Sequence, residues 1–382
     1  MTGLYSAVGE QLTHYVVDVG NYALHRQSTV MLPAPVQYVW PHPSKQFLYV
    51  VSGHRGKSGP GSKHCLSALR VDETGALHEH GPVQSLPQRP LHVSLDATGS
   101  YALVAYNDPA GITVHRINAD RTIGPQVEQP AALDVGIFPH QTLMMPGDRS
   151  AILVTRGNDA AAHKAEDPGA LKVMRFEDGV LRNVASIAPG GGYGFGPRHL
   201  DFHPTQPWVY VSLERQNKLQ MYERDGDQLA ATPKFEKDLL AEPSHVRPRQ
   251  LGGTVHVHPG GRYVYVANRA DDTTDFEGTP VFAGGENSIA AYAIDPGSGE
   301  PELIQHADPQ SFHVRTFAIE PTGRMLVTAS IMPMHVRDDS GVHLVPAALT
   351  IFRIGEDGRL AYMRKYDVAT NGKHQFWMGI VG

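Results

Sequence analysis

The sequence predicts an all-β fold in which four-stranded antiparallel sheets form the seven blades of a β-propeller. Three observations lead to this prediction: one unit recurs six times, a second turn motif recurs between the copies, and the chain ends supply a seventh unit. The 382 residues are 41% hydrophobic and include 39 Gly and 29 Pro, scattered along the chain. That distribution is typical of many short strands joined by turns. We expect residues 1–382 to form a single domain.

The recurring unit is a Pro/Gly-type turn followed by an apolar run, as in residues 258–269 (HPGGRYVYVANR). The six copies align on one turn position, at Pro43, Ala97, Pro146, Pro204, Pro259 and Pro321. Successive positions are 54, 49, 58, 55 and 62 residues apart. This spacing is close to the ~50-residue period of the longer propeller blades.

The second motif is an Asp/Gly-rich hairpin turn, as in residues 72–77 (DETGAL) and 356–360 (EDGRL). Gly adopts positive φ without strain and Asp tolerates it, so these segments predict tight turns. A seventh, weaker copy at residues 18–24 has no unit before it, and residues 376–381 (FWMGIV) can supply its missing inner strand. We therefore expect both termini in one blade, which closes the ring without a long free edge. No long window has a helical period, so helix should be scarce.

Composition argues against several classes of protein. The formal net charge is −6 and no Lys/Arg run occurs, which disfavours a nucleic-acid binder. Cys65 is the lone cysteine, so an internal disulfide is excluded and a reducing compartment is favoured. The N-terminal residues do not resemble a signal peptide, and no stretch approaches ~20 apolar residues. We expect a soluble cytoplasmic protein that binds neither nucleic acid nor membrane, and the oligomeric state stays open.

Equivalent positions in successive blades should form rings around the central channel, because the innermost strand of each blade lines it. Six residues before the aligned turn position, the first ring holds Gln37, Leu91, His140, Arg198, Gly253 and Arg315. Ten residues after it, the second ring holds Gly53, Asn107, Arg156, Glu214, Arg269 and Ile331. The strands between are antiparallel, so both rings should lie at one mouth. Buried charges are costly unless paired or used, so these polar rings indicate a binding site, with a solvated rim as the alternative.

Several of these residues resemble a known family. Pro139-His140, residues 196–199 (GPRH) with 202–204 (FHP), Glu214 and Asn268-Arg269 are similar to the β-propeller lactonase family. That family includes bacterial 6-phosphogluconolactonases and fungal 3-carboxy-cis,cis-muconate lactonising enzymes, and the resemblance extends from Tyr5 to Trp377. It implies a seven-bladed propeller with a catalytic His, Arg, Glu, Arg set.

Carried onto this sequence, the implied catalytic residues are His140, Arg198, Glu214 and Arg269, which the repeat register also selects. Arg156 adds a cation that the family pattern does not include. Two insertions, roughly 157–169 and 270–286, follow second-ring positions and should reshape the mouth.

Lactone hydrolysis needs an activated water, a stabiliser for the oxyanion and a group that holds the anion of the substrate. Glu214 or His140 can act as the base, and a His near its free pKa of ~6.5 suits neutral pH. Arg198 and Arg269 suit the other two tasks, since guanidinium binds carboxylate and phosphate bidentately. Arg156 and Arg315 are further anion-binding candidates. Gln37 and Asn107 complete the expected substrate-binding set.

We expect no cofactor and no metal. Pairs such as His78/His80 and His256/His258 have strand spacing but lack further ligands. The Gly-rich residues 190–196 precede a strand and not a helix, so we interpret them as a flexible lip beside Arg198.

Two other functions stay open. A muconate-type cycloisomerase would use the same groups to close a lactone ring. A non-catalytic binding scaffold is the second alternative, although no Trp-Asp repeat signature recurs.

Overall fold

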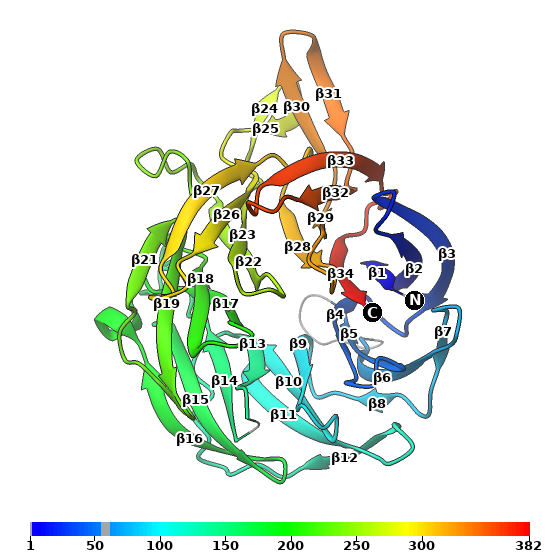
Figure 1. Ribbon diagram of the computed structural model, residues 1–382, viewed down its shortest axis with the longest axis vertical. Coiled ribbons are helices and arrows are strands. Elements are labelled where there is room, and N and C mark those ends of the chain that lie inside the picture. The colour runs from blue at the N-terminus through cyan, green and yellow to red at the C-terminus, as the bar shows by residue number, and fades with distance from the viewer. Residues whose placement is uncertain (1, 55–61, 148) are drawn as a thin grey trace.

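The structure is a computed structural model that describes residues 2–54, 62–147 and 149–382. Seven small antiparallel sheets stand in a ring around a central channel, so the predicted seven-bladed β-propeller is confirmed (Figure 1). Within these ranges the helical structure is a single 3-10 turn, Pro189–Gly192. None of the described segments forms a helix that could cross a membrane.

Each blade has an innermost strand against the channel and a second strand beside it. The innermost strands are β4 (Val36–Pro41), β9 (Pro90–Leu95), β13 (Pro139–Met144), β17 (Pro197–Phe202), β22 (Gln250–Val257), β28 (Val314–Ile319) and β34 (Gln375–Val381). Their neighbours are β5 (Phe47–Gly53), β10 (Tyr101–Asn107), β14 (Ser150–Thr155), β18 (Trp208–Leu213), β23 (Tyr263–Ala270), β29 (Met325–Ser330) and β1 (Gly3–Val8). Second strands such as β14, β18 and β29 are buried along their whole length, because adjacent blades cover both of their faces.

The outer half of each blade is more polar. The third strands are β6 (His64–Val71), β11 (Ala110–Ile117), β15 (Ala170–Glu177), β19 (Lys218–Asp225), β26 (Ser288–Ile294), β32 (Ala348–Ile354) and β2 (Gln11–Asp18). The outermost strands are β7 (Leu77–Glu79) with β8 (Gln84–Ser85), β12 (Ile123–Val127), β16 (Val180–Ile187), β20 (Gln228–Leu229) with β21 (Phe235–Asp238), β27 (Pro301–Ala307), β33 (Leu360–Asp367) and β3 (Ala23–Met31). In two blades two short strands therefore share the outermost level.

The ring closes where the sequence predicted. β34 pairs antiparallel with β1, with Leu4 opposite Ile380, and β2 and β3 complete this blade. The two termini lie side by side in Figure 1. The innermost and second strands of this blade therefore come from opposite ends of the chain.

The recurring His-Pro turns join neighbouring blades. The Nε2 atom of His203 lies 2.8 Å from the carbonyl oxygen of Gly261, and that of His258 lies 2.9 Å from the carbonyl oxygen of Gly323. Each glycine belongs to the equivalent turn of the next blade. The repeat motif thus encodes an inter-blade hydrogen bond as well as a turn.

Two hairpins lie outside the blades. β24 (Thr273–Phe276) and β25 (Thr279–Phe282) form within the insertion at 270–286, and β30 (Met334–Asp338) and β31 (Gly341–Val345) form the second hairpin. They project together at the top of Figure 1, where the Arg337 guanidinium lies 3.9 Å from the centre of the Phe276 ring. The sequence did not indicate the second hairpin.

Candidate active site

A β-bulge in each innermost strand turns the first-ring residue out of the ladder. Pairing with the second strand skips Gln37, Leu91, His140, Arg198 and Arg315 in five of the blades. The ladder is also irregular around Gly253, and in the terminal blade it skips Phe376. A bulge redirects a side chain away from the sheet face. The first ring is therefore a repeated structural device, and Phe376 is a member that the sequence analysis missed.

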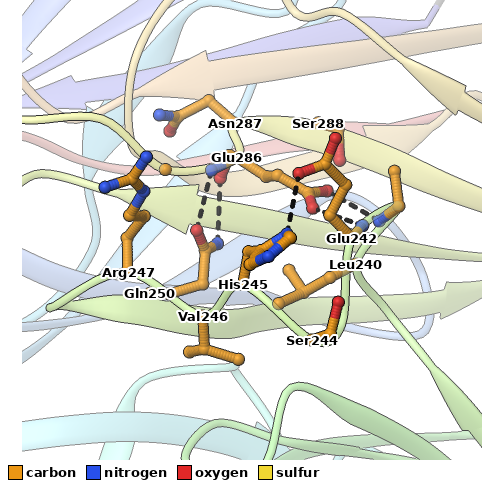
Figure 2. Close-up of a pocket in the computed structure, with 12 residues that line it drawn as sticks. Leu240, Glu242, Ser244, His245, Val246, Arg247, Gln250, Glu286, Asn287 and Ser288 are labelled. Carbon is orange, nitrogen blue, oxygen red and sulfur yellow. Dashed lines mark hydrogen bonds and ion pairs between the residues drawn. The ribbon is translucent and has the colours of Figure 1, made fainter.

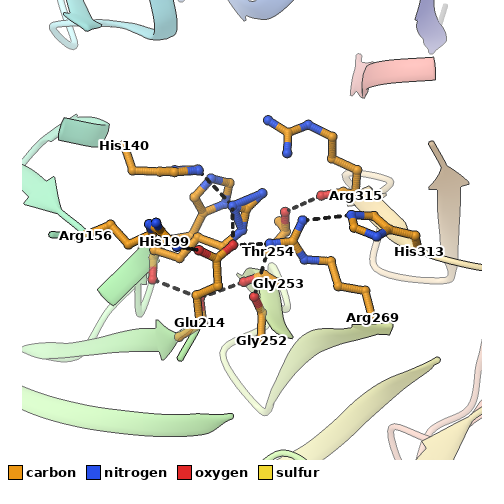
Figure 3. A network of polar contacts seen from close by, with 12 residues as sticks. His140, Arg156, His199, Glu214, Gly252, Gly253, Thr254, Arg269, His313 and Arg315 are labelled. Atoms are coloured by element: carbon orange, nitrogen blue, oxygen red, sulfur yellow. Dashed lines mark hydrogen bonds and ion pairs between the residues drawn. The ribbon is translucent and has the colours of Figure 1, made fainter. Parts of the chain in front are cut away.

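Glu214 is the centre of a buried ion-pair cluster (Figure 3). Its Oε2 accepts a hydrogen bond from Arg156 at 2.9 Å, while its Oε1 lies 3.5 Å from a guanidinium nitrogen of Arg198. Oε1 also accepts a short hydrogen bond from Arg269. Arg198, Glu214 and Arg269 are 1%, 6% and 3% exposed. Three positive charges thus share one carboxylate in a largely desolvated setting.

Two of these arginines also contact a histidine each. The Nε2 atom of His140 is 2.8 Å from Arg198, and the Nε2 atom of His313 is 3.1 Å from Arg269. Because arginine only donates, both Nε2 atoms act as acceptors. The order of contacts is His140, Arg198, Glu214, Arg269, His313. The structure thus brings the four predicted catalytic residues into one chain of contacts, while their catalytic roles stay a prediction.

The cluster fixes the charge states of its members. Burial raises the pKa of Glu214, but Arg269, Arg198 and Arg156 outweigh that effect and lower it to about 2. Burial, followed by the positive charge of Arg198, lowers the pKa of His140 well below 6.5. Glu214 is therefore ionised and His140 neutral at pH 7. The expectation of a His140 near its free pKa is wrong, because the side chain is enclosed next to cations.

Two of the predicted anion-binding arginines, Arg156 and Arg315, stack on aromatic rings. Arg156 stacks on the Phe138 ring at 4.7 Å and lies 3.4 Å from Asp159 in the insertion at 157–169. Arg315 stacks on the Phe376 ring at 3.7 Å. Both guanidinium groups are thus held over aromatic rings.

Gln37, in β4, is held by contacts outside the ion-pair cluster. It donates to the carbonyl oxygens of Pro35 and Gly53 and accepts from Arg89. With Arg315, His140 and Arg198 it lines a cavity of about 10 Å³, room for about one water molecule. In the described part of the chain, no hydrogen bond or ion pair joins Asn107 to this cluster.

Family-model comparison covers residues 1–332, and the matching family is the lactonase, seven-bladed beta-propeller family. The chain belongs to this family. The prediction of a lactonase-type enzyme is thereby confirmed at the level of the family, while substrate and mechanism are separate questions.

Similar proteins with established names are lactonases as well. It is 27% identical over 311 residues to a 6-phosphogluconolactonase of Pectobacterium carotovorum, with 81% of each chain covered. It is 26% identical over 340 residues to the 6-phosphogluconolactonase of Bacillus subtilis, with 86% of each covered.

Solved structures share the fold. A putative 6-phosphogluconolactonase from Bacteroides uniformis matches with a TM-score of 0.74 at 18% identity, covering 100% of this chain and 99% of that one. The periplasmic gluconolactonase of Pseudomonas aeruginosa matches with a TM-score of 0.71 at 19% identity, with the same coverage.

A pocket of about 860 Å³ lies next to Ala270, the last residue of the strand that carries Arg269. Figure 2 shows Arg247, Gln250, Glu286 and Asn287 among its lining residues. Gln250 pairs with Ala270 on β23, and the Asn287 side chain bonds to both backbone groups of Ala270. The insertion at 270–286 supplies one wall of this pocket. The sequence predicted the insertion but not the pocket.

The Gly-rich segment also meets an insertion. Gly169 donates to the carbonyl oxygen of Gly192, and Glu166 accepts a hydrogen bond from the backbone of Gly194. Residues 190–196 therefore lie against the insertion at 157–169. Across the described residues, no three His, Cys, Asp or Glu side chains gather as a metal site requires.

Some site residues could have been found by counting two positions further back. Eight residues before the aligned turn position lie Arg89, Phe138 and His313. Each contacts a ring residue: Arg89 contacts Gln37, Phe138 contacts Arg156, and His313 contacts Arg269. All three directly precede an innermost strand, so the repeat register was the signal that was available.

Proposed function

We propose that this lactonase-family chain hydrolyses an anionic, sugar-derived lactone at the mouth of its channel. The observation that carries the proposal is the convergence of Arg156, Arg198 and Arg269 on Glu214 in a buried setting. The names of the relatives, 6-phosphogluconolactonase and gluconolactonase, support a sugar-acid lactone as the substrate class.

The arginines have two tasks in this mechanism. Attack by water places negative charge on the carbonyl oxygen of the lactone, and N–H donors held in a desolvated site stabilise it strongly. We assign this task to Arg198 and Arg269, which are the more deeply buried pair. Arg156 is more accessible, and it suits a phosphate or carboxylate group of the substrate.

Glu214 is our choice for the base, in the substrate complex. Each guanidinium that turns from Glu214 to the substrate removes one of the charges that lower its pKa, so the carboxylate becomes more basic on binding. It accepts a proton from water while the oxygen bonds to the lactone carbonyl carbon. The ring C–O bond then breaks, and the ring oxygen takes that proton to leave a hydroxy acid.

His140 is the weaker candidate for the base. Its Nε2 accepts from Arg198 at 2.8 Å, and Arg198, Arg315 and Arg156 disfavour a positive imidazole there. A neutral His140 instead holds Arg198 in its donor orientation.

The test is acid release from 6-phosphogluconolactone, glucono-1,5-lactone and a carboxymuconolactone. Arg269→Ala should lower kcat ~10²–10³-fold, as loss of an oxyanion donor typically does. His78→Ala is a matched control, because the exposed His78 ring is paired with Asp72 at 2.7 Å on an outermost strand. Reaction with the carboxymuconolactone alone would favour the cycloisomerase, and a wild-type protein inactive on all three lactones would refute the proposal.

The cytoplasmic location is also a proposal. It is supported by Cys65, which is a buried free cysteine. Subcellular fractionation tests it, and recovery of the protein in the periplasm would contradict it. The Pseudomonas aeruginosa protein with the same fold is named as periplasmic.

A further inference from the structure

We propose that Asp271 and His313 position Arg269, and that protonation of His313 releases this arginine from its working orientation. The kinetic part of this inference rests on the proposed function. His313 precedes β28, and its Nε2 accepts a hydrogen bond from Arg269 at 3.1 Å. Its Nδ1 lies 3.0 Å from the Asp271 carboxylate. The Asp271 carboxylate therefore contacts the His313 imidazole, which in turn contacts the guanidinium of Arg269 in the ion-pair cluster.

Both supports of Arg269 are themselves fixed. Arg249 binds the two oxygens of Asp271 at 2.7 and 2.8 Å, which orients the carboxylate. Asn287 accepts from the backbone nitrogen of His313 at 2.7 Å and from that of Ala270 at 3.2 Å. Asn287 thereby joins the end of β23 to the segment before β28, and it sets the distance between His313 and Arg269.

These contacts determine the tautomer of His313. Arg269 has only donors, so Nε2 must be unprotonated and the proton of the neutral ring lies on Nδ1, toward Asp271. Burial lowers the pKa of His313 to about 4, with Arg269 and Arg315 acting in the same direction and Asp271 opposing them. At neutral pH the ring is therefore a neutral acceptor for Arg269.

The His140 arm of the cluster lacks such a support. Among the described residues no ion pair joins the His140 ring to a carboxylate, whereas Asp271 lies 3.0 Å from Nδ1 of His313. A carboxylate behind the ring stabilises one tautomer and raises the affinity for a second proton. His313 is thus the histidine of the cluster whose orientation is set by a dedicated acid.

Protonation of His313 changes the sign of its contact with Arg269. Nε2 then carries a hydrogen and a share of positive charge, so it repels the guanidinium where it previously accepted from it. Since the pKa is depressed, this occurs only as the pH falls toward about 4. The activity should therefore be level near neutral pH and decline on the acid side as Arg269 turns away.

The experiment compares His313→Ala, His313→Gln and Asp271→Asn, with His78→Gln as the matched control. His78 also contacts an aspartate, at 2.7 Å, but on the exposed side of a blade. We expect His313→Ala to lower kcat up to ~10²-fold, as misplacement of a catalytic group by ~1 Å does. His313→Gln should recover most of that loss, since its amide oxygen can accept from Arg269. It should also lose the part of the acid decline that comes from His313.

Asp271→Asn provides the pH signature. Removing the carboxylate removes the charge that raises the pKa of His313, so the acid decline should move to lower pH. A merely structural role would leave the position of this decline unchanged. Circular dichroism and thermal unfolding confirm that each variant is folded.

Two results would overturn the inference. The first is a His313→Gln variant as inactive as His313→Ala while folded, which would mean that the ring does more than accept from Arg269. The second is independent of substrate: the ¹⁵N imidazole signals of the wild-type protein that His313→Gln removes must show a protonated Nδ1. A protonated Nε2 would refute the arrangement. A wild-type protein with the correct tautomer but no lactonase activity would refute the proposed function and leave the arrangement standing.

Discussion

Replacing Glu214 by Gln removes the negative charge that Arg156, Arg198 and Arg269 share, with almost no change in volume. Breaking a buried ion pair by neutralising one partner costs ~3–5 kcal/mol, because the other charge stays buried and unpaired. At ~2.1 cal/mol/K per residue, a chain of this length has an unfolding entropy of roughly 0.8 kcal/mol/K. We therefore expect Tm to fall by about 4–6 °C. Glu214→Gln should thus lose stability as well as activity.

The same variant should gain an anion site. Three guanidiniums without their carboxylate bind sulfate or phosphate, and a ligand at 100 times its Kd adds ~2.7 kcal/mol of stability, or roughly 3 °C here. Thermal unfolding with and without sulfate measures both effects, and sulfate should raise the Tm of Glu214→Gln more than that of the wild type. Glu223→Gln, which loses an exposed contact with Lys234, is the control and should change stability by less than ~0.5 kcal/mol. A Glu214→Gln Tm within about 1 °C of the wild type would refute the ion-pair cluster.

Two predictions concern the fold. Deleting residues 375–382 removes β34 and leaves β1 without its inner partner. The soluble yield and the cooperative unfolding transition should therefore both be lost. An unfolding transition at the wild-type temperature, measured by calorimetry, would contradict closure of the ring by this strand. Gly261→Ala places a Cβ 2.6 Å from the His203 ring at a φ of +70°, and should destabilise by ~1–3 kcal/mol in denaturant titrations. Gly278→Ala has a φ of +83° but open space around the Cβ, so equal losses in both variants would show that the His203 contact is irrelevant.

The blades and rings could be predicted because a propeller repeats one local structure. Any position of the repeat has the same place in every blade, so counting from the turn placed His140, Arg198, Glu214 and Arg269 near one mouth. The terminal blade followed from an unpaired hairpin at residues 18–24 and an apolar run at the other end. These inferences need only strand alternation and closure of the ring.

The charge states of the site residues and their degree of burial could not be predicted from the repeat. The pKa of His140 depends on its enclosure and on three neighbouring arginines, which are brought together from different blades. Asp271 lies two residues beyond Arg269 in sequence, yet its contact with His313 depends on how two blades meet. The hairpin of β30 and β31 packs on an insertion and not on a blade, so the repeat register gives no information about it.

The asymmetry of the site has its origin in one blade. At the bulge, the blade of β22 has Gly253 where its neighbours have Arg198 and Arg315, and Gly252 comes directly before it. A Cβ at Gly252 would come within 2.6 Å of the Leu213 carbonyl oxygen, so the backbone itself passes beside the cluster. Gly252 donates to the backbone oxygen of Glu214 at 3.0 Å and accepts from Arg269 at 3.4 Å. Because no first-ring side chain fills this sector, Arg269 can reach Glu214 from the second strand. Glycine at one first-ring position thus allows Arg269 of the second ring to complete the ion-pair cluster around Glu214.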